Sequence, residues 1–218
     1  MVFVYTAPKV LIAERVAPRY DPSPVEIYSA RSLLAAGTEL RLITNSDVYG
    51  VYIDDDDLIP RAAETVLESG FDTSRVKDHD DTTYATPVAD LAVGEVRDHA
   101  LWDLGSIAWR VLCAVLRGSY TTTLTRVLVS SDGAAWTTAV ECAGATCTAA
   151  YYASFRYVKL QSYNKATQAS FADHFRYYSV EVYPPNLRKM LVATADMYKM
   201  IRAVSRYSSQ LLEFMRLT

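Results

Sequence analysis

Short apolar runs separated by polar turns predict strands in the first part of the chain. β-branched and aromatic residues dominate these runs, which lie at residues 2–6, 9–16, 40–44 and 48–53. A loop that contains three prolines, residues 17–24, follows the second run. Residues 25–37 favour a short helix that ends at Gly37. We therefore expect a β-rich N-terminal extension over residues 1–60.

Four adjacent aspartates, Asp54 to Asp57, follow the last of these runs. A calcium loop spaces its aspartates alternately around a glycine turn. This run lacks that spacing, so a solvated acidic turn is the preferred interpretation. Asp57 can cap a short helix that has Pro60 in its first turn and ends before Gly70. A strand at residues 66–69 is the alternative.

Residues 71–184 carry the pattern of an all-β sandwich, in which apolar strands alternate with turns about every 8–12 positions. The predicted strands are residues 100–105, 109–117, 124–131, 136–142, 155–163 and 177–183. Asp132 and Gly133 predict a hairpin turn in which the glycine adopts a positive φ. Trp136 begins the returning strand, where its ring is expected to be buried at the edge of the sandwich.

Beyond Pro184 and Pro185 the apolar positions follow one another at alternating spacings of three and four. Such a heptad pattern, sustained for about four heptads, predicts one long amphipathic helix of up to about 30 residues over 185–218. The apolar positions are Leu187, Met190, Thr194, Met197, Ile201, Val204, Ser208, Leu211 and Met215. A self-associating coiled coil is favoured over a helix that packs along the protein's own N-terminal strands.

Composition narrows the range of partners. The net charge is −3 and the sequence pI is about 5.6, without a cluster of Lys and Arg, so we expect no nucleic-acid partner. A run of about 18 uncharged apolar residues is absent, so we expect no membrane insertion. The N-terminus lacks the basic start and continuous apolar run of a signal peptide. Export would then occur by lysis, in a particle, or after removal of a leader.

The chain has three cysteines. Cys142 and Cys147 flank the short segment AGAT, and a hairpin there could bring them within bridging distance. Whether they form a disulfide stays open, because nothing in the sequence fixes the compartment. Cys113 lies in an apolar run and is expected to be a small buried side chain.

The sequence contains no recognisable catalytic motif. The three histidines, His79, His99 and His174, lack metal-ligand spacing, and the chain has no nucleophile elbow, phosphate-binding loop or dinucleotide fingerprint. A Ser-His-Asp triad leaves no such signature, because its members need not be neighbours in sequence. We therefore expect a binding protein and not an enzyme.

Five segments of the β region match one family in order. They are Lys77–Ala85, Ala100–Ser106, Arg117–Thr138, Phe155–Ser162 and Tyr177–Pro184. Together they resemble the F5/8 type C (discoidin-like) family of galactose-binding-like jelly-roll domains, whose members commonly read DGDxxTxW, IDLGS, S.DG..W and ARYVRL. The resemblance covers roughly residues 66–184. It implies a mainly β fold with a discoidin-like jelly-roll β-sandwich over residues 61–184, in which Trp136 is architectural.

The resemblance also implies a structural calcium site in the first segment. The matching residues are Asp78, Asp80, Thr83 and Glu181. Oxygen ligands of this kind suit a hard cation. His79 replaces the family's glycine between the two aspartates, and Ala85 stands where tryptophan is common. A carboxylate turn that is hydrogen-bonded to its own backbone is the alternative.

Discoidin-like domains bind their ligands at loops on one end of the sandwich. A sugar needs an aromatic ring for stacking and a few side-chain donors and acceptors. The candidate ligand-binding residues are Arg117, Tyr120, Tyr151, Tyr152, Tyr163, Asn164, Phe171 and His174. Core packing or a protein–protein contact is the alternative role for each.

Two functions fit these observations. The first is a structural protein of a virion or other surface assembly, a homo-oligomer held with other assembly proteins by its terminal segments, with attachment to a host-surface glycan as a secondary role. The second is a secreted carbohydrate-binding module. Modules of that kind usually carry a signal peptide and are fused to an enzyme, and neither feature is seen here. The sequence therefore favours the assembly protein, located in a virion or at an extracellular surface.

Overall fold

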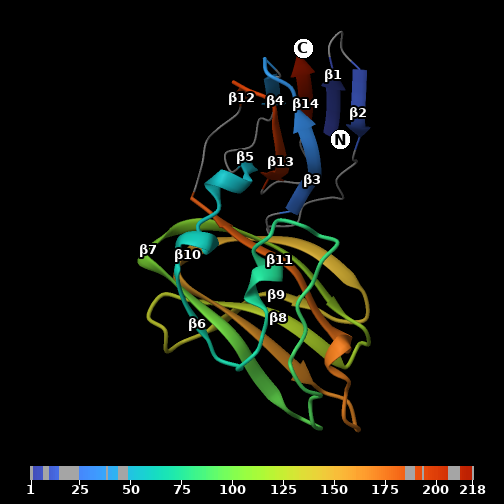
Figure 1. The fold of residues 1–218 in the computed structure, drawn as a ribbon, viewed down its shortest axis with the longest axis vertical. Helices are drawn as coiled ribbons and strands as arrows, with labels where there is room; N and C mark the ends of the chain where they lie inside the picture. The colour runs from blue at the N-terminus through green and yellow to red at the C-terminus, as the bar shows by residue number, and fades with distance from the viewer. Residues whose placement is uncertain are drawn as a thin grey trace. The chain divides into compact units, whose positions relative to one another are not determined.

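The computed structural model describes residues 2–6, 10–14, 25–37, 39–43, 49–184, 190–192, 194–205 and 212–217. The chain divides into two compact units. Unit 1 combines Met1–Asp57 with Pro185–Thr218, and unit 2 is Leu58–Pro184. Strands dominate both units (Figure 1), which confirms the mainly β fold class. Within the described residues, no helix is long and apolar enough to span a membrane.

Unit 1 is built from strands of both chain ends. They are β1 (Val2–Thr6), β2 (Val10–Glu14), β3 (Val25–Leu34), β4 (Glu39–Ile43), β5 (Tyr49–Ile53), β12 (Met190–Val192), β13 (Met197–Ser205) and β14 (Leu212–Leu217). Its described residues form a five-stranded sheet in the order β12-β4-β14-β1-β2 and a three-stranded sheet in the order β3-β13-β5. The β1–β14 pair is parallel, and the other pairs are antiparallel.

The long helix predicted for residues 185–218 is wrong. The heptad positions Met197, Ile201 and Val204 lie in β13, and Met190 and Met215 lie in β12 and β14. Strand β13 is hydrogen-bonded on one side to β3 and on the other to β5. These partners come from the other end of the chain, so their pairing overrides the local helical spacing.

The other heptad positions add nothing in favour of a helix. Thr194 lies in a bend, and Leu187, Ser208 and Leu211 lie outside the described residues. The coiled coil was the physical basis for predicting self-association, and that basis is lost. The short helix predicted for residues 25–37 is also wrong, because β3 occupies most of that segment.

The aspartate run forms a 3₁₀ turn, η1 (Asp54–Asp56), directly after β5. The main-chain nitrogen of Met200 donates a hydrogen bond of 2.7 Å to Asp54 Oδ1. Lys199 Nζ donates to Asp55 Oδ1 at 2.8 Å. The run is therefore not only a solvated turn, since two of its carboxylates are bonded to strand β13.

Unit 2 begins with short elements and continues with long strands. They are η2 (Ile59–Arg61), β6 (Ala63–Val66), η3 (Thr73–Val76), β7 (Val96–Gly118), β8 (Thr123–Ser130), β9 (Thr137–Cys142), β10 (Thr146–Asn164), η4 (Ala172–His174) and β11 (Phe175–Tyr183). The predicted helix between Asp57 and Gly70 is wrong, because only the single turn η2 forms around Pro60 and strand β6 follows it. The sheet order is β11-β7-β10-β8-β9, and β6 pairs with β7.

Strands β7 and β10 are long enough to belong to two layers. The second half of β7 pairs with the first half of β10 and with β11, whereas β8 pairs only with the second half of β10. In a flat sheet the C-terminal ends of β7 and β9 would lie well apart, because β10 and β8 separate the two strands. Yet Cys142 Sγ lies 3.3 Å from the carbonyl oxygen of Leu116. The sheet therefore folds over on itself, and its two halves face each other as a sandwich.

The corner of this fold lies at residues 104–107 of β7. The ladder to β10 passes from Asp103 directly to Ala108, so four residues bulge out. Gly105 sits in the bulge with a φ of +82°, a left-handed conformation that glycine adopts without steric cost. The bulge bends the strand, as irregular insertions in a ladder do.

Two arginines brace the corner. Arg110 is 5% exposed and donates hydrogen bonds to the carbonyl oxygens of Ser106, at 2.8 Å, and Phe155. Arg156 forms two hydrogen bonds of 2.7 and 2.6 Å with the carboxylate of Asp103. Arg156 holds the pKa of Asp103 at about 2, because the ion pair favours the charged carboxylate.

The core of unit 2 lies between the two halves of the sheet. Buried side chains from β7, β8, β9, β10 and β11 contribute to one cluster. Trp102 of β7 is 0% exposed, and its Nε1 donates to Glu64 Oε2 at 3.0 Å. The Asp132–Gly133 turn forms as predicted, with Gly133 at a φ of +76°. Trp136, however, is only half-buried, and Lys159 Nζ lies 4.3 Å from its ring centroid.

Candidate functional site

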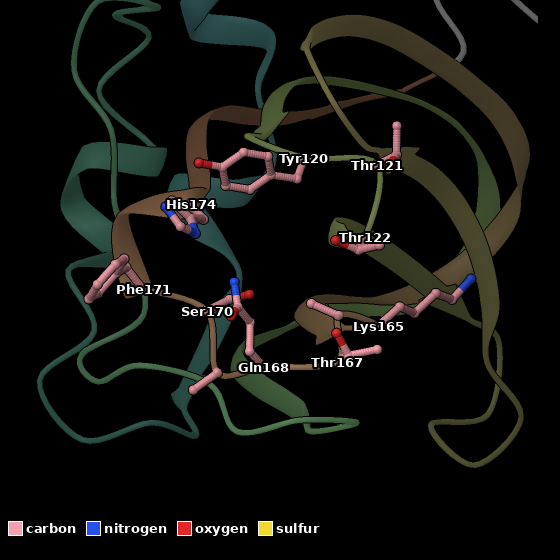
Figure 2. A pocket seen from close by; sticks show the side chains of 11 residues that line it. Tyr120, Thr121, Thr122, Lys165, Thr167, Gln168, Ser170, Phe171 and His174 are labelled. Carbon is pink, nitrogen blue, oxygen red and sulfur yellow. The ribbon is translucent and has the colours of Figure 1, made fainter.

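An open pocket of about 540 Å³ lies between two loops of unit 2. One loop, residues 119–122, joins β7 to β8, and the other, residues 165–174, leads from β10 to β11. We call this site the loop pocket (Figure 2). Its lining residues are Tyr120, Thr121, Thr122, Lys165, Ala166, Thr167, Gln168, Ala169, Ser170, Phe171 and His174.

The first loop is a tight turn whose shape requires a glycine at its start. A Cβ on Gly118 would lie 2.0 Å from the carbonyl oxygen of Thr123, so no other residue fits there. The turn closes when Thr123 donates its main-chain N–H to the carbonyl oxygen of Tyr120 at 3.0 Å. This turn positions Tyr120 at the edge of the pocket.

A disulfide loop supports this turn. Cys142 and Cys147 are joined, which settles the pairing that the sequence left open. Within the loop, Gly144 donates its N–H to the carbonyl oxygen of Tyr120 at 2.9 Å. A Cβ on Gly144 would come within 3.3 Å of the Thr121 side chain, so the two loops are in close contact.

The second loop is shaped by a buried asparagine. Asn164 is 0% exposed, and its amide nitrogen donates to the carbonyl oxygens of Leu91, at 3.1 Å, and Gln168, at 3.0 Å. Its side-chain oxygen accepts from the main-chain nitrogen of Ala166 and from Ser170 Oγ. Asn164 therefore fixes the wall of the pocket and is not placed to contact a ligand.

Aromatic rings gather at one end of the pocket. Phe171 is 66% exposed and Tyr120 is 56% exposed. The ring of His174 meets Tyr120 edge to face at 4.8 Å between centroids and Phe171 at 5.4 Å. Figure 2 shows Tyr120 and His174 side by side, with Phe171 below them. Among the described residues, His174 Nδ1 is a buried nitrogen without a hydrogen-bond partner.

The remaining lining supplies hydroxyl, amide and ammonium groups. Thr122, Thr167 and Ser170 carry hydroxyls, Gln168 carries an amide, and Lys165 carries the ammonium group. The lining includes no Asp or Glu. The pocket thus combines exposed ring faces with several hydrogen-bonding groups and one flexible cation.

Several predicted ligand-binding residues meet at this pocket. Tyr120, Phe171 and His174 line it, and Asn164 lies behind its wall. Tyr163 is not part of the lining, although Lys165 Nζ lies 5.5 Å from its ring centroid. The candidate residues from the sequence did not include the threonines or Lys165 individually, although the segment 162–175, which contains Lys165 and Thr167, was favoured for its aromatic, amide and charged side chains.

The other predicted residues lie elsewhere in unit 2. Tyr152 stacks on Trp109 with centroids 5.0 Å apart, on the paired strands β10 and β7. Tyr151 lines a separate, smaller pocket of about 180 Å³ beside the Asp132–Gly133 turn. Arg117 is half-buried in β7 and does not line the loop pocket.

Three of the four predicted calcium ligands share one turn. Thr83 Oγ1 donates to Asp78 Oδ2 at 2.5 Å, and the main-chain nitrogen of Asp80 donates to Asp78 Oδ1 at 2.9 Å. His79 has a φ of +55°, so the turn keeps a left-handed residue where the family has glycine. The turn is closed by its own side chains and backbone.

The fourth predicted ligand, Glu181, is 0% exposed and accepts a hydrogen bond of 2.5 Å from Tyr183 Oη. In the part of the chain that the structure describes, no three or more His, Cys, Asp or Glu side chains are grouped as metal ligands. The arrangement fits a self-bonded carboxylate turn better than a cation site. Calcium stays a prediction from the resemblance, and no role is derived for it.

A second polar cluster has the connectivity of a catalytic triad. Glu68 Oε2 lies 2.6 Å from His99 Nδ1, and His99 Nε2 lies 2.8 Å from Ser162 Oγ. Ser162 Oγ is also 3.0 Å from Tyr177 Oη, and Phe71 stacks on the His99 ring. We call Glu68, His99, Ser162 and Tyr177 the buried network.

Access distinguishes this network from an active site. His99, Ser162 and Tyr177 are each 0% exposed, so a substrate cannot reach the serine hydroxyl in this structure. Burial by itself raises the pKa of Glu68, but hydrogen bonds from His99, Val88 and Arg97 outweigh it and hold that pKa below its ordinary value. The network satisfies buried polar groups and thereby stabilises the core.

Comparisons with known proteins find similar chains only among solved structures. No family model matches the sequence, and no curated protein matches it. Among solved structures, chitosan-binding module 1 of a chitosanase/glucanase from Paenibacillus sp. IK-5 is 21% identical, with a TM-score of 0.39, over 58% of this chain and 98% of that one.

Two further modules give similar values. Chitosan-binding module 2 of the same enzyme, solved with chitotriose, is 18% identical, with a TM-score of 0.38, over 58% of this chain and 99% of that one. CBM32-1 of a family 31 glycoside hydrolase from Clostridium perfringens is 15% identical, with a TM-score of 0.38, over 58% and 96%. These carbohydrate-binding modules are discoidin-like jelly-roll domains, the family that the sequence motifs resemble. At these identities and TM-scores, the ligands of the modules say nothing about the ligand of this chain.

Proposed function

We propose that unit 2 is a non-catalytic glycan-binding module and that its ligand occupies the loop pocket. The observation that carries this proposal is the pair of exposed rings, Tyr120 and Phe171, beside a lining of hydroxyl and amide groups. A sugar ring has an apolar C–H face and hydroxyl groups around its edge. The C–H face can stack on the aromatic rings, and the hydroxyls can hydrogen-bond to the polar lining.

His174 supports the same ligand class. Its buried Nδ1 has no partner among the described residues, and such a group costs free energy until it is hydrogen-bonded. Because Nδ1 is buried, a sugar hydroxyl reaches it only when the imidazole turns toward the pocket, and a hydroxyl can then pair with either tautomer of the ring. The edge-to-face contacts with Tyr120 and Phe171 make the imidazole part of the aromatic side of the pocket.

The disulfide favours a site of action outside the reducing cytosol. Disulfides such as Cys142–Cys147 persist mainly in oxidising compartments. We therefore propose that the protein acts outside the cell, as a secreted carbohydrate-binding module would. Homo-oligomer formation is not proposed, because strands replace the helix of the predicted coiled coil. Virion assembly is not proposed either, since neither the structure nor the comparisons support it.

Glycan binding is tested with the whole chain on a glycan array and then by calorimetry with the strongest ligand. Phe171→Ala and Tyr120→Ala should each weaken binding by about tenfold or more, equivalent to about 1.4 kcal/mol, because each removes a stacking surface. Tyr198→Ala is the matched control, since Tyr198 is 58% exposed but belongs to unit 1. Absence of any glycan ligand, or equal affinity of all three variants, would refute the proposal.

A further inference from the structure

Most cations of unit 2 have a carboxylate partner. The ion pairs are Arg75–Asp72, Lys77–Glu64, Arg97–Glu68, Arg126–Glu141, Arg156–Asp103, Lys159–Asp98 and Arg176–Asp173. Lys165 differs, because no carboxylate of the described residues forms a salt bridge with its exposed side chain. Its contact is the ring of Tyr163. Lys165 is therefore a cation that lines the loop pocket and is not neutralised.

The acidic groups near the pocket are already engaged. Asp173 precedes His174, but its carboxylate is paired with Arg176. Asp90 accepts a hydrogen bond of 2.9 Å from the main-chain nitrogen of Ala172. Asp90 keeps its charge, but neither carboxylate belongs to the lining, so Lys165 is the one Lys or Arg among the described lining residues and no Asp or Glu lies there with it.

The pocket is also divided in space. Figure 2 shows Tyr120, Phe171 and His174 on one side and Lys165 with Thr122 and Thr167 on the other. A sugar ring stacked on the aromatic side would extend its next substituent or residue toward the lysine side. The flexible stem of a lysine lets its ammonium group follow such a substituent.

We propose that the loop pocket selects glycans that carry an anionic group, a carboxylate or a sulfate, and that Lys165 is its specificity-determining residue. This inference rests on the proposed glycan-binding function. An anionic sugar pairs with the unneutralised ammonium group, and the threonine hydroxyls supply further donors on the same side of the pocket. A cationic amino sugar finds no carboxylate in the lining and is repelled by Lys165, so charge discriminates between the two.

The test compares ligands of different charge, matched in sugar backbone for the anionic arms. Trigalacturonic acid and its fully methyl-esterified form share one sugar backbone, and galactose 6-sulfate against galactose tests sulfate separately. Chitotriose, a glucosamine trimer with free amino groups, is the cationic ligand in the comparison. We expect the acid to bind the whole chain about three- to tenfold more tightly than the ester, which is the range for one exposed charge-assisted contact. Chitotriose should bind more weakly than either.

Variants assign this preference to one residue. Lys165→Gln should make acid and ester bind equally, and Lys165→Arg should keep the preference, because it keeps the positive charge. Arg75→Gln is the control, since it makes the same change in net charge on an exposed side chain outside the lining. Raising the salt concentration to about 0.5 M should shrink the preference of the natural chain by screening.

The outcomes separate the inference from the function on which it rests. Equal binding of acid and ester, tighter binding of chitotriose, or an unchanged preference in Lys165→Gln would overturn the inference. The glycan-binding function would survive those results if Phe171→Ala still weakened binding. If no arm binds at all, the proposed function fails and the inference fails with it. A preference for only the carboxylate or only the sulfate would identify which anion the pocket recognises.

Discussion

Two histidines of unit 2 show how the same side chain serves opposite purposes. His99 lies in the buried network, where Glu68 and Ser162 take both ring nitrogens at 2.6 and 2.8 Å. His174 lies in the loop pocket, where one buried nitrogen lacks a partner among the described residues. The first region has the hydrogen-bond pattern of a catalytic site without access. The second lies in an open pocket and retains unmet bonding capacity at a buried nitrogen, and both properties support the proposed ligand site.

The largest expected effect comes from exchanging each histidine for alanine. His99→Ala should lower the free energy of unfolding by about 3–5 kcal/mol, because it leaves a cavity and strips Glu68 of a buried partner. His174→Ala should lower it by less than about 1 kcal/mol and should weaken glycan binding. Urea denaturation of both variants measures the difference. Equal losses of stability would show that the contrast between the two regions is false.

Removal of the disulfide should have the next largest effect. The double variant Cys142→Ser, Cys147→Ser should lose about 2 kcal/mol of stability, since the bridge closes a short loop. Amide NMR signals of Thr121 and Gly144 should shift, because the loop supports the pocket rim. Signals of His99 and Tyr177 should stay in place, and a shift of similar size there would mean that the pocket and the buried network are not independent.

Two tryptophans sharpen the same contrast at a smaller scale. Trp136 is half-buried, so Trp136→Ala should cost about 1–2 kcal/mol, less than the roughly 3–5 kcal/mol of a fully buried aromatic ring. Trp102→Ala represents the fully buried case. Thermal and urea unfolding measure the loss of stability in Trp136→Ala and Trp102→Ala. A larger loss for Trp136 would place the main support of the core at the hairpin.

The smallest expected effect is a dependence on pH that belongs to the buried network. The folded-state pKa of Glu68 is lowered, so its contribution to stability is present above the unfolded pKa of about 4.3 and is lost as pH falls through the folded value. Glu68→Gln should therefore reduce the loss of stability between about pH 6 and about pH 3. His174→Ala should leave that slope unchanged, and a matching reduction there would contradict the assignment.

The fold of unit 2 could be predicted well because its signals are local. The Asp132–Gly133 turn and the alternating strands that flank it require only neighbouring residues to be recognised. The strand β13 could not be found in this way, because its apolar spacing is helical. Its partners β3 and β5 lie about 150 residues or more away in sequence, and only their pairing makes it a strand.

The candidate site was predictable only in part, for a related reason. Phe171 and His174 lie in a polar loop and were found by composition, whereas Tyr152 looked equivalent in sequence but sits inside the 19-residue strand β10. Asn164 was expected to contact a ligand, yet its amide is hydrogen-bonded to the main chain of Leu91, Ala166 and Gln168 and to Ser170 Oγ. Bonding of this kind depends on which loops meet in space, and sequence spacing does not carry that information.

The bulge at residues 104–107 has a consequence for how unit 2 comes apart. Strands β7 and β10 each run through both layers. The two layers are therefore connected by continuous strands and cannot separate as independent sheets. Unfolding of one layer should also disrupt the other, because the hydrogen bonds of Arg110 to Ser106 and Phe155 connect them at the corner. Unit 2 should therefore unfold in a single cooperative step, and a ligand bound at the proposed site would stabilise the whole sandwich against unfolding.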